Sequence, residues 1–226
     1  MRYHNDIFNR LGWSRQENES NTTTLLRNAA ISSLGHLGDN AVISRAKMLF
    51  DDYIRSGKDI EPDIRSVIYA INARVGGPST FERFVSLYKK EQIPEEKIRF
   101  LRAIGSVKDP ELIERALKFA LSKEVRRQYV DWIPSLVASE DYGKKIIWKW
   151  VKSNWKRFMS MYDRGPGGLD DFVEILAILD KKETRREIEL FFKNKSNYRN
   201  DIKRSIAKTL EFIDINIRFK EFNAEY

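Results

Sequence analysis

The sequence predicts an all-α fold, an α-α superhelix (solenoid) built from stacked helical hairpins. Apolar residues recur every three or four positions along almost the whole chain, which is the spacing of one face of a helix. No segment alternates convincingly in the manner of a strand. Glycine (11) and proline (6) are few among 226 residues, which argues against an all-β chain with many tight turns.

Helix start and stop signals divide the N-terminal half. Threonines at 22–24 are placed to cap the first helix, and Gly38 ends it. Pro62, Pro94 and Pro110 stand in first turns, where a missing N–H costs nothing. The expected helices span residues 22–37, 41–56, 62–75, 81–88, 94–104 and 110–120.

The C-terminal half continues the pattern with longer elements. Residues 125–138 read as one helix, kinked or interrupted at Pro134. The glycine-rich run 165–168 is expected to be a turn. The remaining expected helices span residues 142–162, 169–179, 184–192 and 198–222.

Residues 142–162 carry the strongest pattern. One face collects large apolar side chains: Trp148, Val151, Trp155, Phe158, Met159 and Tyr162. The opposite face collects Lys145, Lys149, Lys152 and Lys156. A basic stripe facing an anionic partner is one interpretation. A core-facing aromatic stripe with a solvated lysine back is the other, and the tryptophan spacing favours it. Trp150 lies off this face and is expected to contact a neighbouring helix.

Similar tetrapeptides open successive hairpins at irregular intervals, which indicates a degenerate repeat whose members stack. They place an arginine at one repeat position, in the order Arg27, Arg65, Arg99 and Arg126. These arginines could line a concave face and grip a peptide carboxylate. They could instead form structural ion pairs between hairpins, with Glu61, Asp63 or Glu95 as partners, and we weigh the structural use higher.

Composition excludes several kinds of chemistry. The chain has no cysteine and two histidines, which excludes a disulfide scaffold, a thiol nucleophile and an iron–sulfur site. H-E-x-x-H, G-x-S-x-G and Walker-type motifs are absent. The acidic pair 170–171 is explained by a helix first turn. We therefore assign no catalytic and no metal-binding residue.

The net charge of +8 and the hydropathy bear on location and partners. No run reaches the roughly 18 apolar residues of a membrane span. The N-terminus has no apolar segment of signal-peptide type. We expect a soluble, cytoplasmic chain with no membrane partner.

Several segments, in a shared order, resemble the C-terminal helical domain of the gluzincin zinc aminopeptidases. The segments are Leu11-Gly12-Trp13, Leu25–Ala30, Ile60–Arg65, Val125–Gln128 and the Asn-Trp helix Trp148–Trp155. That family includes archaeal tricorn-interacting factors, puromycin-sensitive aminopeptidase, aminopeptidase N and the endoplasmic-reticulum aminopeptidases. The resemblance covers residues 7–222.

The resemblance implies one HEAT- or armadillo-like solenoid domain over residues 1–226. Within it, residues 1–21 would be a lead-in and residues 22–222 the hairpin array. In the family this domain cups the catalytic domain and closes the peptide chamber. The zinc ligands and catalytic glutamate belong to upstream domains, so zinc is expected in the catalytic domain and not in this chain. The implied partners are that catalytic domain and peptide substrates.

The candidate peptide-binding residues are Arg65, Arg99, Arg126 and Arg127. Arg65, Arg99 and Arg126 come from the repeat position, and Arg127 follows Arg126 directly. The basic residues that hold peptide C-termini in some relatives have no matching side chains here; one falls near Gly105. The alternatives are a basic solenoid that binds nucleic acid, motivated by the +8 charge and the lysine stripe, and a stand-alone protein-interaction scaffold.

Overall fold

The computed structural model describes residues 2–163 and 168–224. Within these ranges the chain forms α-helices and short 3-10 helices and no strand, which confirms the all-α prediction. Most of the turn predicted at 165–168 lies outside the described residues. The chain divides into two compact units, Met1–Leu112 and Ile113–Tyr226.

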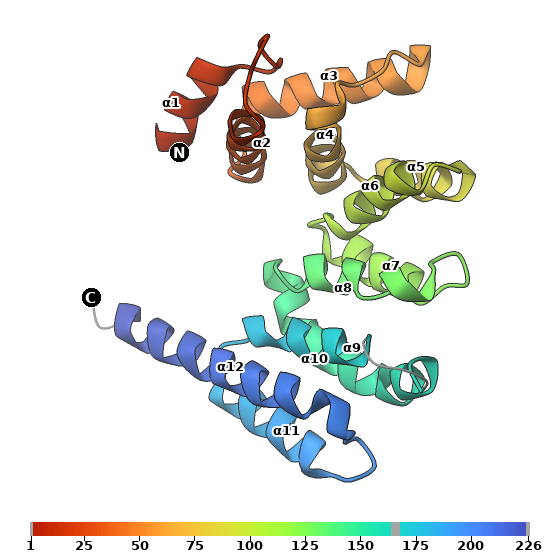
Figure 1. Cartoon of the computed structure of the whole chain (residues 1–226), viewed down its shortest axis with the longest axis vertical. Coiled ribbons are helices and arrows are strands. Elements are labelled where there is room, and N and C mark those ends of the chain that lie inside the picture. The colour runs from red at the N-terminus through yellow and green to blue at the C-terminus, as the bar shows by residue number, and fades with distance from the viewer. Residues whose placement is uncertain (1, 164–167, 225–226) are drawn as a thin grey trace. The chain divides into compact units, whose positions relative to one another are not determined.

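The first unit consists of six helices and the start of a seventh. They are α1 (Arg2–Leu11), α2 (Asn21–His36), α3 (Asn40–Ser56), α4 (Pro62–Val75), α5 (Pro78–Lys90), α6 (Pro94–Gly105) and the first residues of α7 (Pro110–Ala120). Helix α4 packs against α2, α3 and α6, and α5 packs against α6, so neighbours in sequence are neighbours in space (Figure 1). Helix α1, which packs against α2, was not predicted.

Four aromatic rings from four consecutive helices form the core of the first unit. They are Phe50, Tyr69, Phe84 and Phe100, and all are nearly inaccessible to solvent. The Phe50 and Phe84 rings stack with centroids 4.9 Å apart, and Tyr69 stacks on Phe100 at 5.0 Å. Such contacts add to the free energy of burying each ring and join α3, α4, α5 and α6 into one layer.

The predicted apolar face of α2 is confirmed in part. The sequence predicts a stripe through Leu26, Ala29, Ala30, Ser33, Leu34 and Leu37. Ala30 and Leu34 are buried as predicted, whereas Ala29 and Leu37 are exposed. The buried face also contains Arg27, and apolar periodicity cannot locate a buried arginine.

Local chemistry sets the helix ends of the first unit. The hydroxyl of Ser20, one turn earlier than expected, accepts the N–H of Thr23 and caps α2. Asp39 caps α3 through the N–H of Val42. Prolines stand in the first turns of α4, α5 and α6, as the sequence predicts for α4 and α6.

The second unit mixes long helices with short and 3-10 segments. It holds the rest of α7, η1 (Arg127–Tyr129), α8 (Trp132–Val137), α9 (Asp141–Met161), α10 (Leu169–Glu174), η2 (Ile175–Ile178), α11 (Lys182–Lys193), η3 (Asn200–Ile202) and α12 (Lys203–Ala224). Helix α12 packs against α10, η2 and α11, and α11 and α12 form an antiparallel hairpin (Figure 1).

Two predicted helices of this unit are broken. Residues 125–138 form a 3-10 turn and then the short helix α8, in which Pro134 is the third residue and needs no intrahelical N–H partner. Residues 169–179 begin as α10 and tighten into η2 before the extended residue Leu179. The apolar spacing is compatible with either helix type, so it could not separate them.

The aromatic face of α9 is buried and its lysine face is exposed. Trp155 is 1% exposed, and Phe158 stacks on Phe172 of α10 with centroids 3.9 Å apart. Lys145, Lys149, Lys152 and Lys156 are exposed. This confirms the core-facing interpretation of the stripe. Trp150 contacts Phe172 as well, as expected for a residue that meets a neighbouring helix.

Candidate functional site

Two of the four candidate arginines meet at one buried carboxylate in the first unit. Arg65 of α4 and Arg99 of α6 donate to Oε2 of Glu96, at 2.8 and 2.6 Å. The Tyr69 hydroxyl donates to the other oxygen at 2.9 Å. Burial alone would raise the pKa of Glu96, but the hydrogen bonds from Arg65, Arg99 and Tyr69 hold it below its usual value.

The two arginines of this cluster differ in how much they offer to solvent. Arg65 also donates to the carboxylate of Asp59 at 2.7 Å and to the carbonyl of Ile60, and its side chain is 15% exposed. Arg99 is paired only with Glu96 among the described residues, and its side chain is 27% exposed. Both form ion pairs within the unit, as the structural alternative predicts, although the partner is Glu96 rather than the neighbouring Glu95.

The first arginine of the repeat series is the most deeply buried. The Arg27 side chain is 1% exposed and grips both oxygens of Glu19, with one contact at 2.6 Å. Its Nε donates to the Leu11 carbonyl at 3.2 Å, which ties α2 to the end of α1. The hydrogen bond from Arg27 is the main cause that lowers the pKa of Glu19 to about 2. Arg27 is therefore a structural residue.

The other two candidates lie in the second unit, at the irregular segment before α8. Arg126 and Arg127 are both exposed. The Arg127 guanidinium lies over the Tyr162 ring, 4.6 Å from its centroid, and the Tyr162 hydroxyl donates to the Arg127 carbonyl at 2.6 Å. Burial, reinforced by the charge of Asp131, raises the pKa of Tyr162 to about 12, so its hydroxyl keeps the proton it donates.

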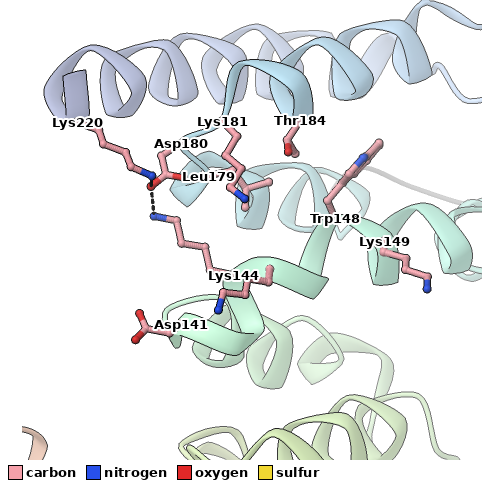
Figure 2. A pocket seen from close by; sticks show the side chains of 10 residues that line it. Asp141, Lys144, Trp148, Lys149, Leu179, Asp180, Lys181, Thr184 and Lys220 are labelled. Atoms are coloured by element: carbon pink, nitrogen blue, oxygen red, sulfur yellow. Dashed lines mark hydrogen bonds and ion pairs between the residues drawn. The ribbon is translucent and has the colours of Figure 1, made fainter. Parts of the chain in front are cut away.

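A basic pocket of the second unit was missed by sequence reasoning. It has a volume of about 410 Å³ and lies among the start of α9, the loop into α11 and the end of α12 (Figure 2). We call it the lysine pocket. Its lysines are Lys144, Lys145, Lys149, Lys181 and Lys220, and Asp141, Trp148, Leu179, Asp180 and Thr184 complete its lining. The sequence pattern places Lys145 and Lys149 on one face of a helix, but no spacing rule joins them to Lys181 and Lys220 of other elements.

The part of the chain that the structure describes offers no metal site and no membrane-spanning helix. No group of three or more histidine, cysteine or acidic side chains there is arranged to hold a metal ion. No helix in the same ranges combines the length and the apolar character that a bilayer crossing requires.

Comparison with known proteins decides the family. A family model described as "ERAP1-like C-terminal domain" matches residues 2–215. The chain belongs to this family of C-terminal domains. The match covers both units and extends into α12, so it confirms the resemblance found over residues 7–222.

Individual relatives are aminopeptidases of much greater length. Aminopeptidase M1 of Arabidopsis thaliana is 26% identical over 217 residues, which cover 94% of this chain and 24% of that protein. Aminopeptidase 2 of Candida albicans is 25% identical over 217 residues, covering 95% of this chain and 23% of that protein. Glutamyl aminopeptidase of Mus musculus is 23% identical over 214 residues, which cover 91% of this chain and 22% of that protein. The chain thus spans about a quarter of the length of the relatives it matches.

Proposed function

We propose that this chain is the non-catalytic C-terminal domain of a peptide-trimming zinc aminopeptidase, where it closes the substrate chamber and contacts the C-terminal portion of the peptide. The observation that carries the proposal is the family match over residues 2–215. Relatives whose names state aminopeptidase activity, and of which this chain spans a quarter, support it. A cytoplasmic location and a HEAT- or armadillo-like repeat belong to the same proposal.

In this proposal the two parts of the enzyme divide the chemistry. A zinc aminopeptidase of the H-E-x-x-H type needs two histidines one helical turn apart and a glutamate between them. The sequence has His4 and His36 as its only histidines, and neither belongs to such a motif. The zinc would be held by the catalytic portion, and this chain would contribute shape and charge.

The four candidate arginines take different parts in the proposal. Arg126 and Arg127 are exposed, so their guanidinium groups are available to a peptide carboxylate, and Arg99 is partly available. Arg65 is engaged by Glu96, Asp59 and the Ile60 carbonyl, so its part is to hold α4 and α6 in place. Peptide contact is therefore expected first at Arg126 and Arg127.

Complementation in trans tests the function. The catalytic portion would come from the Candida albicans relative, cut before the quarter that this chain matches. Aminopeptidase activity is measured on peptides of increasing length, with and without this chain, and with the relative's own C-terminal quarter as the positive control. We expect this chain to associate and to change the length preference. Absence of both effects, with a working positive control, would refute the proposal.

Substitutions in the complemented enzyme test the arginines. Arg126→Ala and Arg127→Ala should raise KM for long peptides about threefold to tenfold, because a charge-assisted hydrogen bond is lost. A single-residue amide substrate, which cannot reach this surface, should be unaffected. Arg186→Ala, which removes an exposed arginine of α11, is the matched control. Equal effects of all three variants would show that only net charge matters.

A further inference from the structure

The lysine pocket brings positive charge from three elements to one place. Helix α9 contributes Lys144, Lys145 and Lys149, the loop before α11 contributes Lys181, and α12 contributes Lys220. Against these five cations the lining holds two carboxylates, Asp141 and Asp180 (Figure 2). The pocket therefore has an excess of positive charge that comes from side chains far apart in sequence.

One carboxylate joins two of these lysines. Oδ2 of Asp180 accepts from Lys144 at 3.0 Å and from Lys220 at 3.4 Å (Figure 2). Burial would raise the pKa of Asp180, but these two lysines hold it below its usual value. These two ion pairs connect α9 and α12 to the loop that carries Asp180. They therefore hold one wall of the pocket together.

Three lysines of the lining are left for a ligand. Lys145, Lys149 and Lys181 are exposed and have no carboxylate partner among the described residues. Cations without a carboxylate partner repel one another, and an anion that enters between them relieves that repulsion. Asp141, the first residue of α9, lies at the rim and marks the side where an anion would be disfavoured.

The floor and one end of the pocket add further features of an anion site. Leu179 and Trp148 are 4% and 7% exposed, and the Trp148 indole N–H is engaged by Glu187 at 2.9 Å, so the floor is apolar and fixed. Helix α11 begins beside the pocket, and no side chain caps its first N–H groups. Its third residue, Thr184, lines the pocket with a hydroxyl donor.

We propose that the lysine pocket is a binding site for a small multivalent oxyanion, of the phosphate or polycarboxylate class. The volume of about 410 Å³ is within the range of small-molecule sites and exceeds what one phosphate group fills. The ligand would therefore carry two or more anionic groups, which could contact different lysines of the pocket at the same time. The site does not depend on peptidase activity, so it stands or falls separately from the proposed function.

Calorimetric titration of the full chain tests the site. Pyrophosphate and citrate are the two probes, titrated at about 150 mM salt, where exposed charges more than about 8 Å apart are screened. We expect one equivalent of pyrophosphate, citrate or both to bind. Above the Kd, the unfolding temperature should then rise with the logarithm of the ligand concentration. The stronger of the two probes identifies the ligand class. If neither pyrophosphate nor citrate binds, even at low salt concentration, the proposal is wrong.

A matched pair of charge reversals distinguishes the pocket from general attraction. Lys149→Glu changes a pocket lysine, whereas Lys156→Glu changes an exposed lysine seven residues later on the same helix and outside the pocket. Both variants change the net charge equally. We expect Lys149→Glu to weaken binding about tenfold or more and Lys156→Glu to weaken it less than about twofold. Equal weakening would overturn the proposal.

The nucleic-acid alternative gives a different result in the same experiment. A single-stranded oligonucleotide would contact the whole lysine face of α9, so both charge reversals would weaken it and its affinity would fall steeply with salt. Binding of the oligonucleotide together with no binding of pyrophosphate or citrate would overturn the pocket and favour a nucleic-acid surface.

Discussion

The two units treat buried charge in opposite ways. In the first unit every described buried arginine cluster is matched to a carboxylate: Arg27 holds Glu19, and Arg65 and Arg99 share Glu96. In the second unit Asp131 has no ion pair among the described residues, and burial, reinforced by the charge of Asp171, raises the pKa of Asp131 to about 6. The lysine face of α9 is exposed, and Lys145, Lys149, Lys152 and Lys156 lie on it. The buried arginine pairs therefore join helices in the first unit, whereas the second unit keeps a face of exposed lysines on α9.

Close helix contacts differ in the same two regions. Gly35 of α2 faces the side chain of Ile71, which an added methyl group would meet at 2.6 Å. Gly143 of α9 faces the backbone carbonyl of Val137, which a methyl group would meet at 1.9 Å. A side chain can change its rotamer, but a backbone carbonyl can move only with its helix.

The largest expected loss of stability comes from a substitution of Gly143. Gly143→Ala should lower the free energy of unfolding by about 3 kcal/mol or more, because the methyl group would displace the end of α8 from α9. Gly35→Ala, the matched control, should cost about 1 kcal/mol, since the Ile71 side chain can rearrange. Urea unfolding of both variants measures the difference. Equal losses would show that the two helix contacts are equally tolerant.

The next effect tests the buried arginine. Arg27→Ala should lower the free energy of unfolding by about 2 to 3 kcal/mol, because Glu19 loses its partner inside the protein. Wild-type stability should also fall as the pH drops from 4.5 toward about 2, where native Glu19 takes up its proton, and the variant should lose that component. Arg55→Ala, whose side chain is 74% exposed, should change stability by less than about 0.5 kcal/mol.

A smaller effect is expected at the shared carboxylate. Glu96→Gln keeps the size of the side chain but removes the negative charge to which Arg65, Arg99 and Tyr69 donate hydrogen bonds. It should lower the free energy of unfolding by about 1 to 2 kcal/mol. Tyr69→Phe removes one neutral donor and should cost about 1 kcal/mol. Denaturant midpoints rank the two variants. A larger loss for Tyr69→Phe would mean that the hydroxyl hydrogen bond, and not the charge of Glu96, contributes more to stability here.

The pH dependence expected from Asp131 has the opposite sign. Because native Asp131 holds its proton more tightly than the unfolded chain does, the free energy of unfolding should fall as the pH rises from 3.8 to about 6. Asp131→Asn should therefore stabilise the chain at pH 7 and leave it unchanged near pH 4. Thermal unfolding at the two pH values measures this. Stabilisation of the same size at both values would point to a cause other than ionisation.

Sequence reasoning succeeded where one short signal determines one element. Pro62 and Pro94 begin α4 and α6 at the expected residues, and the tryptophan spacing identified the buried face of α9. These features depend on residues within a few turns of one another. The all-α class follows from the same local periodicity.

The misses share a physical cause, which is contact between residues distant in sequence. Nothing near Arg27 indicates that Glu19 turns back from the preceding loop to pair with it, so Arg27 was not expected on the buried face of α2. The lysine pocket needs Lys144 and Lys220 to meet at Asp180, across separations of 36 and 40 residues. Periodicity carries no information on such distances, so the arginines were ranked by repeat position and the pocket was not found.

The aromatic face of α9 gives the two units different optical signatures. Of five tryptophans, Trp13 belongs to the first unit, and Trp132, Trp148, Trp150 and Trp155 belong to the second. Tryptophan emission therefore reports mainly on the second unit, whereas far-ultraviolet circular dichroism reports on the helices of both. If the units unfold separately, the two signals will give different midpoints for the same sample, and emission will identify which unit melted.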